Sequence, residues 1–280
     1  MRLAWFRPDA GPARQGDDTA LLLEAARARH AVEVVTAAAA HDFVWRQARD
    51  PADLCVFELG RSPAHRFAAA YAIHFPGLAI VRSLARHERA IGASRLAVVA
   101  HDSIARLLAD DGSAARVRTL TPGVEPLPAD APAVVEAIRW PVDGEAFTGA
   151  MAGFAAGRAV IVPECIATAG WPALDPQSWR PRTRAGSDDP ICVSVDVRDE
   201  AHSLRLARRR LADDAALRAR LGAAAHAWWR AHATPAQAAA GFEQLLVAAR
   251  ALEPPAFDAD WGGRLTTAIL AEFGITRAPW

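Results

Sequence analysis

Short apolar segments alternate with helical segments along the first 120 or so residues of the chain. The apolar segments have the length of buried strands, and the segments between them repeat leucine and alanine at helical spacing. The expected strands are Leu3–Phe6, Ala31–Thr36, Asp53–Gly60, Leu78–Val81, Arg95–His101 and Val117–Gly123. Alternating strands and helices are typical of a parallel sheet with helices on both faces. We therefore predict an α/β fold with a Rossmann-like N-terminal domain, residues 1–124.

The segment VEPLPADAP lacks any hydrophobic period and is rich in proline and acid, so residues 125–133 are predicted to be a linker. A second, shortened Rossmann-like domain is expected at residues 134–253, with strands in AVVEAIRW, AVIV and PICVSVDV. Long arginine-rich helices are expected at Glu200–Asp213 and Ala215–Ala231, and a further helix at Pro235–Ala251. Residues 254–280 are expected to hold a last amphipathic helix. The predicted architecture thus has two parallel sheets, the second one truncated, and C-terminal helices.

The stretch RWPVDGEAFTGAMAGFAAGRAVIVP contains the clearest candidate for a binding loop. It predicts a strand end, a tight turn at Asp143 and Gly144, a helix that starts near Glu145, a helix stop at Gly157 and a buried strand. A helix N-terminus at the carboxyl end of a parallel strand is suited to bind an anion such as a phosphate. Glu145 is explained equally well as an ordinary acidic residue in a first helical turn.

Composition narrows the possible functions. The chain carries 32 basic and 32 acidic residues, a balance that disfavours binding to nucleic acid or to an anionic membrane through bulk charge. All basic residues are arginine, so no lysine can act as a phosphate clamp or a general base. The three cysteines match no metal motif and are expected to be buried in a cytoplasmic protein. The sequence contains no long uncharged apolar stretch, although an amphipathic helix could rest on the inner membrane face.

Several segments, in this order, resemble retaining glycosyltransferases of the family 4 type, which have the two-domain GT-B fold. They are DLCVFELGRSPAHRF, VAHDSIA with VRTLTPGVE, the stretch from Arg139 to Pro163, and ICVSVDV with the helices after it. The most specific parts are the Gly-Glu loop with its helix and the D-x-x-L-R-x-x-L-G pattern between Asp213 and Gly222. The resemblance implies transfer of a sugar from a nucleotide-sugar donor without a metal ion or another cofactor.

The resemblance also suggests roles for particular residues. Glu145 matches the glutamate that lies near the donor sugar, and His101, at the end of a predicted strand, is the preferred catalytic histidine. His65 is assigned to the acceptor side. The expected donor-binding residues are Gly16, Asp17, Arg139, Asp143 and Gly144. Structural roles remain open for several of these residues, namely helix capping for Asp17 and the His101 loop, and an ion pair for Arg139.

The chain departs from the family pattern in four ways. Gly153 occupies the position of the second glutamate, and lysine is absent. The first-domain strand that usually ends in a histidine ends here in Ile80-Val81-Arg82-Ser83, and the front of the second domain is too short for a βαβ unit. Two hypotheses follow: a retaining glycosyltransferase, which we prefer, and a non-catalytic relative that binds a partner enzyme or a glycan. A shortened sheet leaves an edge to cover, which favours a homo- or hetero-oligomer.

Overall fold

The computed structural model describes residues 1–8, 18–82, 87–109, 116–138, 147–182 and 189–255. The chain divides into two compact units. The first contains Met1–Ala10, Arg27–Val98 and Gln244–Trp280, and the second contains Gly11–Ala26 and Val99–Glu243. The predicted linker, residues 125–133, has neither helix nor strand, and the domain limits inferred from the sequence remain predictions.

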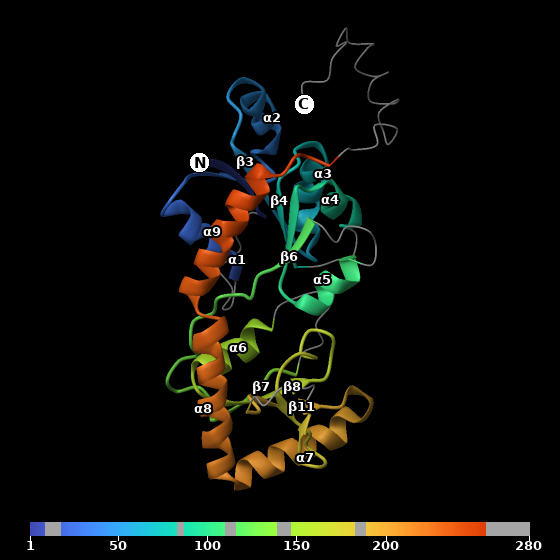
Figure 1. Ribbon diagram of the computed structural model, residues 1–280, viewed down its shortest axis with the longest axis vertical. Coiled ribbons are helices and arrows are strands. Elements are labelled where there is room, and N and C mark those ends of the chain that lie inside the picture. The colour runs from blue at the N-terminus through green and yellow to red at the C-terminus, as the bar shows by residue number, and fades with distance from the viewer. Residues whose placement is uncertain (9–17, 83–86, 110–115, 139–146, 183–188, 256–280) are drawn as a thin grey trace. The chain divides into compact units, whose positions relative to one another are not determined.

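The first sheet confirms the predicted α/β fold. It has six strands in the order β2-β1-β3-β4-β5-β6, and neighbouring strands from β2 to β5 pair in parallel (Figure 1). The bounds of these strands are β1 Arg2–Phe6, β2 Ala31–Val35, β3 Leu54–Leu59, β4 Leu78–Val81, β5 Leu96–Val99 and β6 Val117–Thr119. The strand order reverses between β1 and β3, which therefore form the topological switch point of the sheet.

Helices connect these strands, as the alternating pattern predicts. Their bounds are α1 Asp18–Arg27, α2 Ala40–Arg49, α3 Arg66–His74, α4 Glu88–Ala93 and α5 Asp102–Leu108, with a short 3₁₀ helix at Pro63–His65. The register partners Phe6 and Phe57 lie 4.6 Å apart between ring centroids. Phe43 of α2 and Tyr71 of α3 pack on Phe6 at 4.9 and 5.4 Å. This aromatic cluster holds α2 and α3 against one face of the sheet, and each ring pair adds roughly 0.5–1.5 kcal/mol beyond area burial.

The second sheet has five strands in the order β10-β9-β11-β8-β7. The bounds are β7 Val134–Glu136, β8 Ala159–Pro163, β9 Ala173–Leu174, β10 Pro181–Arg182 and β11 Cys192–Val195. Strands β7, β8, β11 and β9 pair in parallel, and β10 runs antiparallel to β9. The three strands expected from the sequence are β7, β8 and β11. Strands β9 and β10 lie in a segment expected to be a loop, because two residues are too few to show an alternating pattern.

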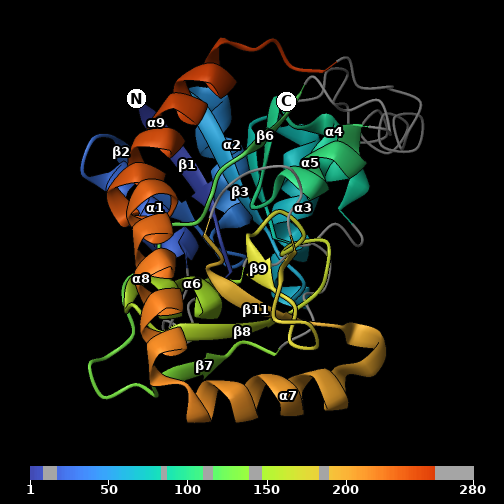
Figure 2. The ribbon, with the colours of Figure 1, turned by 60° about the horizontal axis from the view of Figure 1, so that its bottom comes forward.

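Helices cover both faces of the second sheet. They must do so, because successive side chains of β8 point to opposite faces and all of them are apolar. Val160 and Val162 pack in a cluster with Phe154 of α6, which spans Thr148–Ala155. Ala159 and Ile161 point to the other face, into a cluster with residues of α7 and of the start of α8. Figure 2 shows α7 (Glu200–Asp213) running along the sheet below β7 and β8, and α8 (Ala215–His232) turning up from its end. A strand buried on both faces reads as a continuous apolar run, as AVIV does.

The D-x-x-L-R-x-x-L-G pattern forms the junction between α7 and α8. The Asp214 carboxylate caps α8 by accepting a hydrogen bond from the Leu217 backbone N–H at 2.9 Å. The Arg218 guanidinium donates to the Ala212 carbonyl at 2.8 Å, and so satisfies the end of α7. Leu217 and Leu221 are buried in the core below the sheet. Capping and burial therefore explain the presence of these residues in the pattern, independent of any ligand.

Helix α9 (Pro235–Ala251) ends in the first unit, where an arginine binds its last turn. The Arg95 guanidinium donates to the carbonyl oxygens of Arg250 and Leu252, at 3.3 and 3.0 Å, and its Nε donates to Pro76. Arg250 also pairs with Asp53 at 3.2 Å. The carbonyl groups at a helix C-terminus lack intrahelical partners, so Arg95 acts as a cap supplied from outside the helix.

Two of the three free cysteines, Cys55 and Cys192, are buried as predicted, whereas Cys165 is partly exposed. Burial raises the pKa of both the Cys55 and the Cys192 thiol to about 12. These two thiols are therefore protonated near neutral pH and act as small apolar side chains. Within the described ranges, no helix has the length and apolar character needed to cross a membrane.

Candidate functional site

The predicted donor loop falls largely outside the described residues. This applies to Arg139, Asp143, Gly144 and Glu145, and also to Gly16 and Asp17. Helix α6, however, starts later than expected, at Thr148, and its first turn contains no acidic residue. Glu145 itself lies outside the described residues, so both interpretations of this residue stay predictions.

Phe147 accounts for the late start of α6. It is the N-cap residue of the helix, with φ −78° and ψ 56°, and it makes no side-chain capping hydrogen bond. Its ring is buried and lies 6.1 Å from the Trp171 ring in an edge-to-face arrangement. Burial of this ring fixes the backbone of Phe147 itself in a non-helical conformation, a tertiary effect that the local sequence does not reveal.

His101 lies just beyond the carboxyl end of β5, as predicted, and begins helix α5. Its backbone is extended, and its carbonyl oxygen accepts hydrogen bonds from the N–H groups of Ile104 and Ala105, both at 3.1 Å. The imidazole is buried and makes no capping hydrogen bond to the helix. The next residue but one, Ser103, donates from its hydroxyl to the Ile166 carbonyl at 2.7 Å. A capping role for this loop stays a prediction, because these main-chain bonds are the ones that the first turn of any helix makes.

His65 follows β3, and its ring organises the loop after that strand. Its Nδ1 lies 2.9 Å from the Glu58 carbonyl oxygen, and because a carbonyl only accepts, Nδ1 carries the proton. The Nε2 atom of the same ring lies 2.6 Å from where a Cβ would stand on Gly60. A side chain at position 60 would therefore collide with the imidazole. The structure thus gives His65 a role in holding this loop. The acceptor-side role assigned to it from the sequence stays a separate prediction.

A buried carboxylate lies at the switch point of the first sheet. Glu58, near the end of β3, is 4% exposed and accepts a hydrogen bond from the Trp5 indole N–H of β1 at 2.7 Å. The Arg7 Nε lies 3.6 Å from the same carboxylate oxygen. A buried acid is stable as an anion only when it is paired and hydrogen-bonded, as this one is. Open α/β sheets bind their ligands at the carboxyl ends of the strands beside the switch point.

Sequence reasoning missed Glu58, since it lies inside the apolar run DLCVFELG and was read as part of a strand. A signal was nevertheless present. A single carboxylate within a run of buried residues is rare in proteins unless it is paired or functional.

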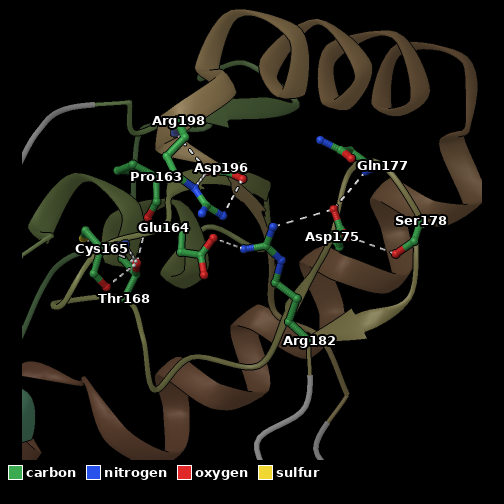
Figure 3. A network of polar contacts seen from close by, with 10 residues as sticks. All are labelled: Pro163, Glu164, Cys165, Thr168, Asp175, Gln177, Ser178, Arg182, Asp196 and Arg198. Atoms are coloured by element: carbon green, nitrogen blue, oxygen red, sulfur yellow. Dashed lines mark hydrogen bonds and ion pairs between the residues drawn. The ribbon is translucent and has the colours of Figure 1, made fainter.

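A second cluster of charged side chains lies at the carboxyl ends of β8, β9 and β11 (Figure 3). The Arg182 guanidinium lies between two carboxylates, hydrogen-bonded to Glu164 and 3.7 Å from Asp175. Asp196, just after β11, binds the side chain of Arg198. The backbone N–H of Arg198, followed by its guanidinium, lowers the pKa of the Asp196 carboxyl, and the charge of Arg182 adds to this effect. Carboxylates and guanidinium groups therefore alternate along this edge.

The loop after β8 is held by one hydroxyl group. Thr168 Oγ1 donates to the Pro163 carbonyl at 2.7 Å and accepts from the Cys165 backbone N–H at 3.1 Å (Figure 3). This closes the chain into a compact turn directly beyond the strand. The turn keeps Glu164 in place for its contact with Arg182.

Such an edge can bind a polar organic ligand. Guanidinium groups donate to phosphate or hydroxyl oxygens, and carboxylates accept from hydroxyl groups. Among the residues that the structure describes, no group of three or more His, Cys, Asp or Glu side chains is arranged to hold a metal ion.

Neither the models of known protein families nor the curated protein sequences match this chain. The resemblance to glycosyltransferases therefore rests on the segments quoted above.

Proposed function

We propose that this protein is a glycosyltransferase that moves a sugar from a nucleotide-sugar donor to an acceptor with retention of configuration. The observation that carries the proposal is the switch point of the first sheet. There the ends of β1 and β3 hold Trp5, Arg7 and the buried carboxylate of Glu58. The residues of the second sheet, with alternating charges at the carboxyl edge, offer a further surface for a polar ligand. The proposed architecture is of the two-domain GT-B type.

In this proposal the protein acts mainly through preorganised charge. Departure of a nucleoside diphosphate leaves negative charge on the leaving group and positive charge on the sugar, and fixed donors and carboxylates stabilise both. Arg139 and the backbone N–H groups after Gly144 bind the diphosphate, and Glu145 binds hydroxyl groups of the sugar. His101 serves the acceptor side. Nδ1 of His65 already donates to the backbone carbonyl oxygen of Glu58 and is not available to a substrate.

Calorimetry with uridine diphosphate and guanosine diphosphate tests the nucleotide-sugar site. We expect one of the two to bind the wild-type protein. For the matching nucleotide sugar we expect Glu145→Ala to weaken binding about tenfold or more, the loss of one hydrogen bond to a charged group. The free nucleotide, which lacks the sugar, should bind the variant as well as it binds the wild type. If neither nucleotide binds at millimolar concentration, the proposal is wrong.

A non-catalytic glycosyltransferase-like subunit is the second candidate. The observation that favours it is that Nδ1 of His65, the candidate for the acceptor side, is engaged with the Glu58 backbone carbonyl. Such a subunit would bind a partner enzyme or a glycan. Size-exclusion chromatography with light scattering, combined with a turnover assay on nucleotide sugars, separates the two candidates. A monomer that turns over a nucleotide sugar rules out the second.

A further inference from the structure

His87 is a buried histidine at the carboxyl end of the first sheet that the proposed function does not use. It follows β4 and precedes helix α4, and the end of β4 pairs with the end of β3 through Val81 and Leu59. The side chain is deeply buried, with the residue 5% exposed. Its Nε2 lies 2.9 Å from the carbonyl oxygen of Gly60, in the loop after β3. The ring is thus fixed to the neighbouring strand's loop.

This contact determines which ring nitrogen carries the proton in the neutral imidazole. A carbonyl oxygen only accepts hydrogen bonds, so Nε2 of His87 carries the proton and donates it. In the neutral imidazole Nδ1 then presents a lone pair. Nδ1 is buried, and among the residues that the structure describes it has no hydrogen-bond partner. Buried polar atoms in proteins are nearly always paired, and an exception calls for a specific reason, such as a ligand or a catalytic role.

The surroundings hold the ring in one place. The carbonyl groups of Glu58, Leu59 and Gly60 are bound in turn by His65 Nδ1, the Arg82 backbone N–H and His87 Nε2, at 2.9, 2.8 and 2.9 Å. Three successive backbone groups are therefore fixed by three different segments. An acceptor atom held this firmly is preorganised for a ligand, because little freedom is lost on binding.

The chemistry of the lone pair selects the ligand. An ionised phosphate or carboxylate has no proton to donate and would meet the lone pair unfavourably. A hydroxyl group donates one hydrogen bond, and away from water that bond is stronger than at the surface. We propose that Nδ1 of His87 accepts a hydrogen bond from a hydroxyl group of the substrate that receives the sugar. This inference rests on the proposed function and adds to it a residue that binds the acceptor.

Two substitutions separate the two ring nitrogens. The amide nitrogen of glutamine can replace Nε2, so His87→Gln keeps the donor to Gly60 and removes the acceptor at Nδ1. Asparagine reaches only the position of Nδ1, so His87→Asn loses the contact with Gly60. We expect His87→Gln to fold as stably as the wild type and His87→Asn to be less stable. His41→Gln, on the exposed face of α2, is the matched control.

The readout is nitrogen NMR of protein labelled with ¹⁵N-histidine, titrated with methyl glycosides of glucose, mannose and galactose. In the free protein the His87 signals should show the Nε2–H tautomer. At least one glycoside should shift the Nδ1 signal and leave Nε2 nearly unchanged. His87→Gln should bind that glycoside about tenfold more weakly or worse, the loss expected for a buried hydrogen bond, and the His41→Gln control should bind it as the wild type does.

The outcomes distinguish this inference from the proposed function. If no glycoside moves the Nδ1 signal, or if His87→Gln binds as tightly as the wild type, the inference is overturned, even when a nucleotide binds. A shift at Nδ1 in a protein that binds neither uridine nor guanosine diphosphate supports a hydroxyl site and rejects the proposed transferase.

Discussion

Two glycines allow helix α8 to contact the turn that ends α6. Gly157 has a positive φ of 64°, the left-handed conformation that favours glycine at the end of a helix. Gly222 lies so close to it that a Cβ at position 222 would stand 2.1 Å from the Gly157 carbonyl oxygen. The obstacle is backbone, which cannot rotate away as a side chain would. The close approach of α8 to this turn therefore depends on both glycines.

Gly222→Ala is expected to destabilise the protein by about 1–3 kcal/mol, the usual cost of forcing an extra methyl group into a packed site. Gly149→Ala is the matched control, since a Cβ at position 149 in α6 meets nothing within 4 Å. Alanine is the better helix former, so this variant should be neutral or gain up to about 1 kcal/mol. Urea unfolding measures both. Equal stability of the two variants would contradict the close approach.

The indole N–H of Trp5 is expected to stabilise the fold in addition to the burial of the ring. Trp5→Phe keeps most of the buried ring but removes the N–H that donates to Glu58 at 2.7 Å. We expect a loss of about 1.5–3 kcal/mol, the range for a hydrogen bond to a charged group. Denaturant unfolding measures this loss. Trp45→Phe, at a side chain that is 58% exposed, is the control and should change stability little. A similar loss at both positions would show that the Trp5–Glu58 bond contributes nothing.

At the scale of elements, the start of α8 should respond to pH. The backbone N–H of Leu217 lowers the pKa of the Asp214 carboxyl from its ordinary value of 3.8, with Arg210 adding to the effect. A lowered folded-state pKa means that the cap stabilises the fold above the ordinary pKa and is lost as the pH falls through the folded-state pKa. Asp214→Ala should therefore destabilise the protein at about pH 7 and have little effect at about pH 2. Asp213→Ala, at the exposed end of α7, is the control for the same pair of urea titrations. A pH-independent loss in Asp214→Ala would argue against the cap.

The hydrogen bonds from Arg95 should hold the end of α9 more firmly than the ion pair between Arg250 and Asp53 does. Arg95→Ala removes the hydrogen bonds to the carbonyl groups of Arg250 and Leu252. Arg250→Ala removes only the exposed pair with Asp53, a kind worth about 0–1 kcal/mol. Hydrogen exchange in the last turn of α9 should accelerate clearly in Arg95→Ala and little in Arg250→Ala. The reverse order would show that the ion pair, and not the cap, secures the helix.

The sequence predicted the elements that have a strong hydrophobic periodicity or a clear residue that ends a helix. Helix α7 was expected at Glu200–Asp213 and helix α9 at Pro235–Ala251, and both have these bounds. Gly157 ends α6 as predicted. The start of α6 was misplaced because burial of Phe147, a contact with Trp171, decides it. Local patterns do not record contacts between distant residues.

The candidate site was harder to predict than the fold. His87 and Glu58 draw their significance from partners 27 and 53 residues away, Gly60 and Trp5. Their neighbours in sequence give little hint of this. His101 was placed correctly at a strand end, because strand ends follow from the hydrophobic pattern. Which atoms of these side chains are engaged depends on tertiary contacts.

At the scale of the whole molecule, each unit contains most of one sheet and fully buried side chains of its own. Leu78 in β4 and Ile161 in β8 are both fully buried, one in each unit. Leu78→Ala and Ile161→Ala should each cost about 2–5 kcal/mol, the range for truncating a large buried aliphatic side chain. Native-state hydrogen exchange should show the loss mainly in the unit that carries the substitution. Equal losses in both units for both variants would show that the chain unfolds as one cooperative body.

The discontinuity of the first unit has a consequence for biosynthesis. The strands of the first sheet lie between Arg2 and Thr119, but Leu246 and Ala249, which are fully buried, belong to the last segment of the first unit. On the ribosome, the apolar surface that these side chains cover stays uncovered until the chain has been synthesised beyond Ala249. Domains generally fold as units, and exposed apolar surface promotes aggregation during that time. We therefore expect ribosome-bound chains that end before Leu246 to aggregate more readily than chains that extend beyond Ala249.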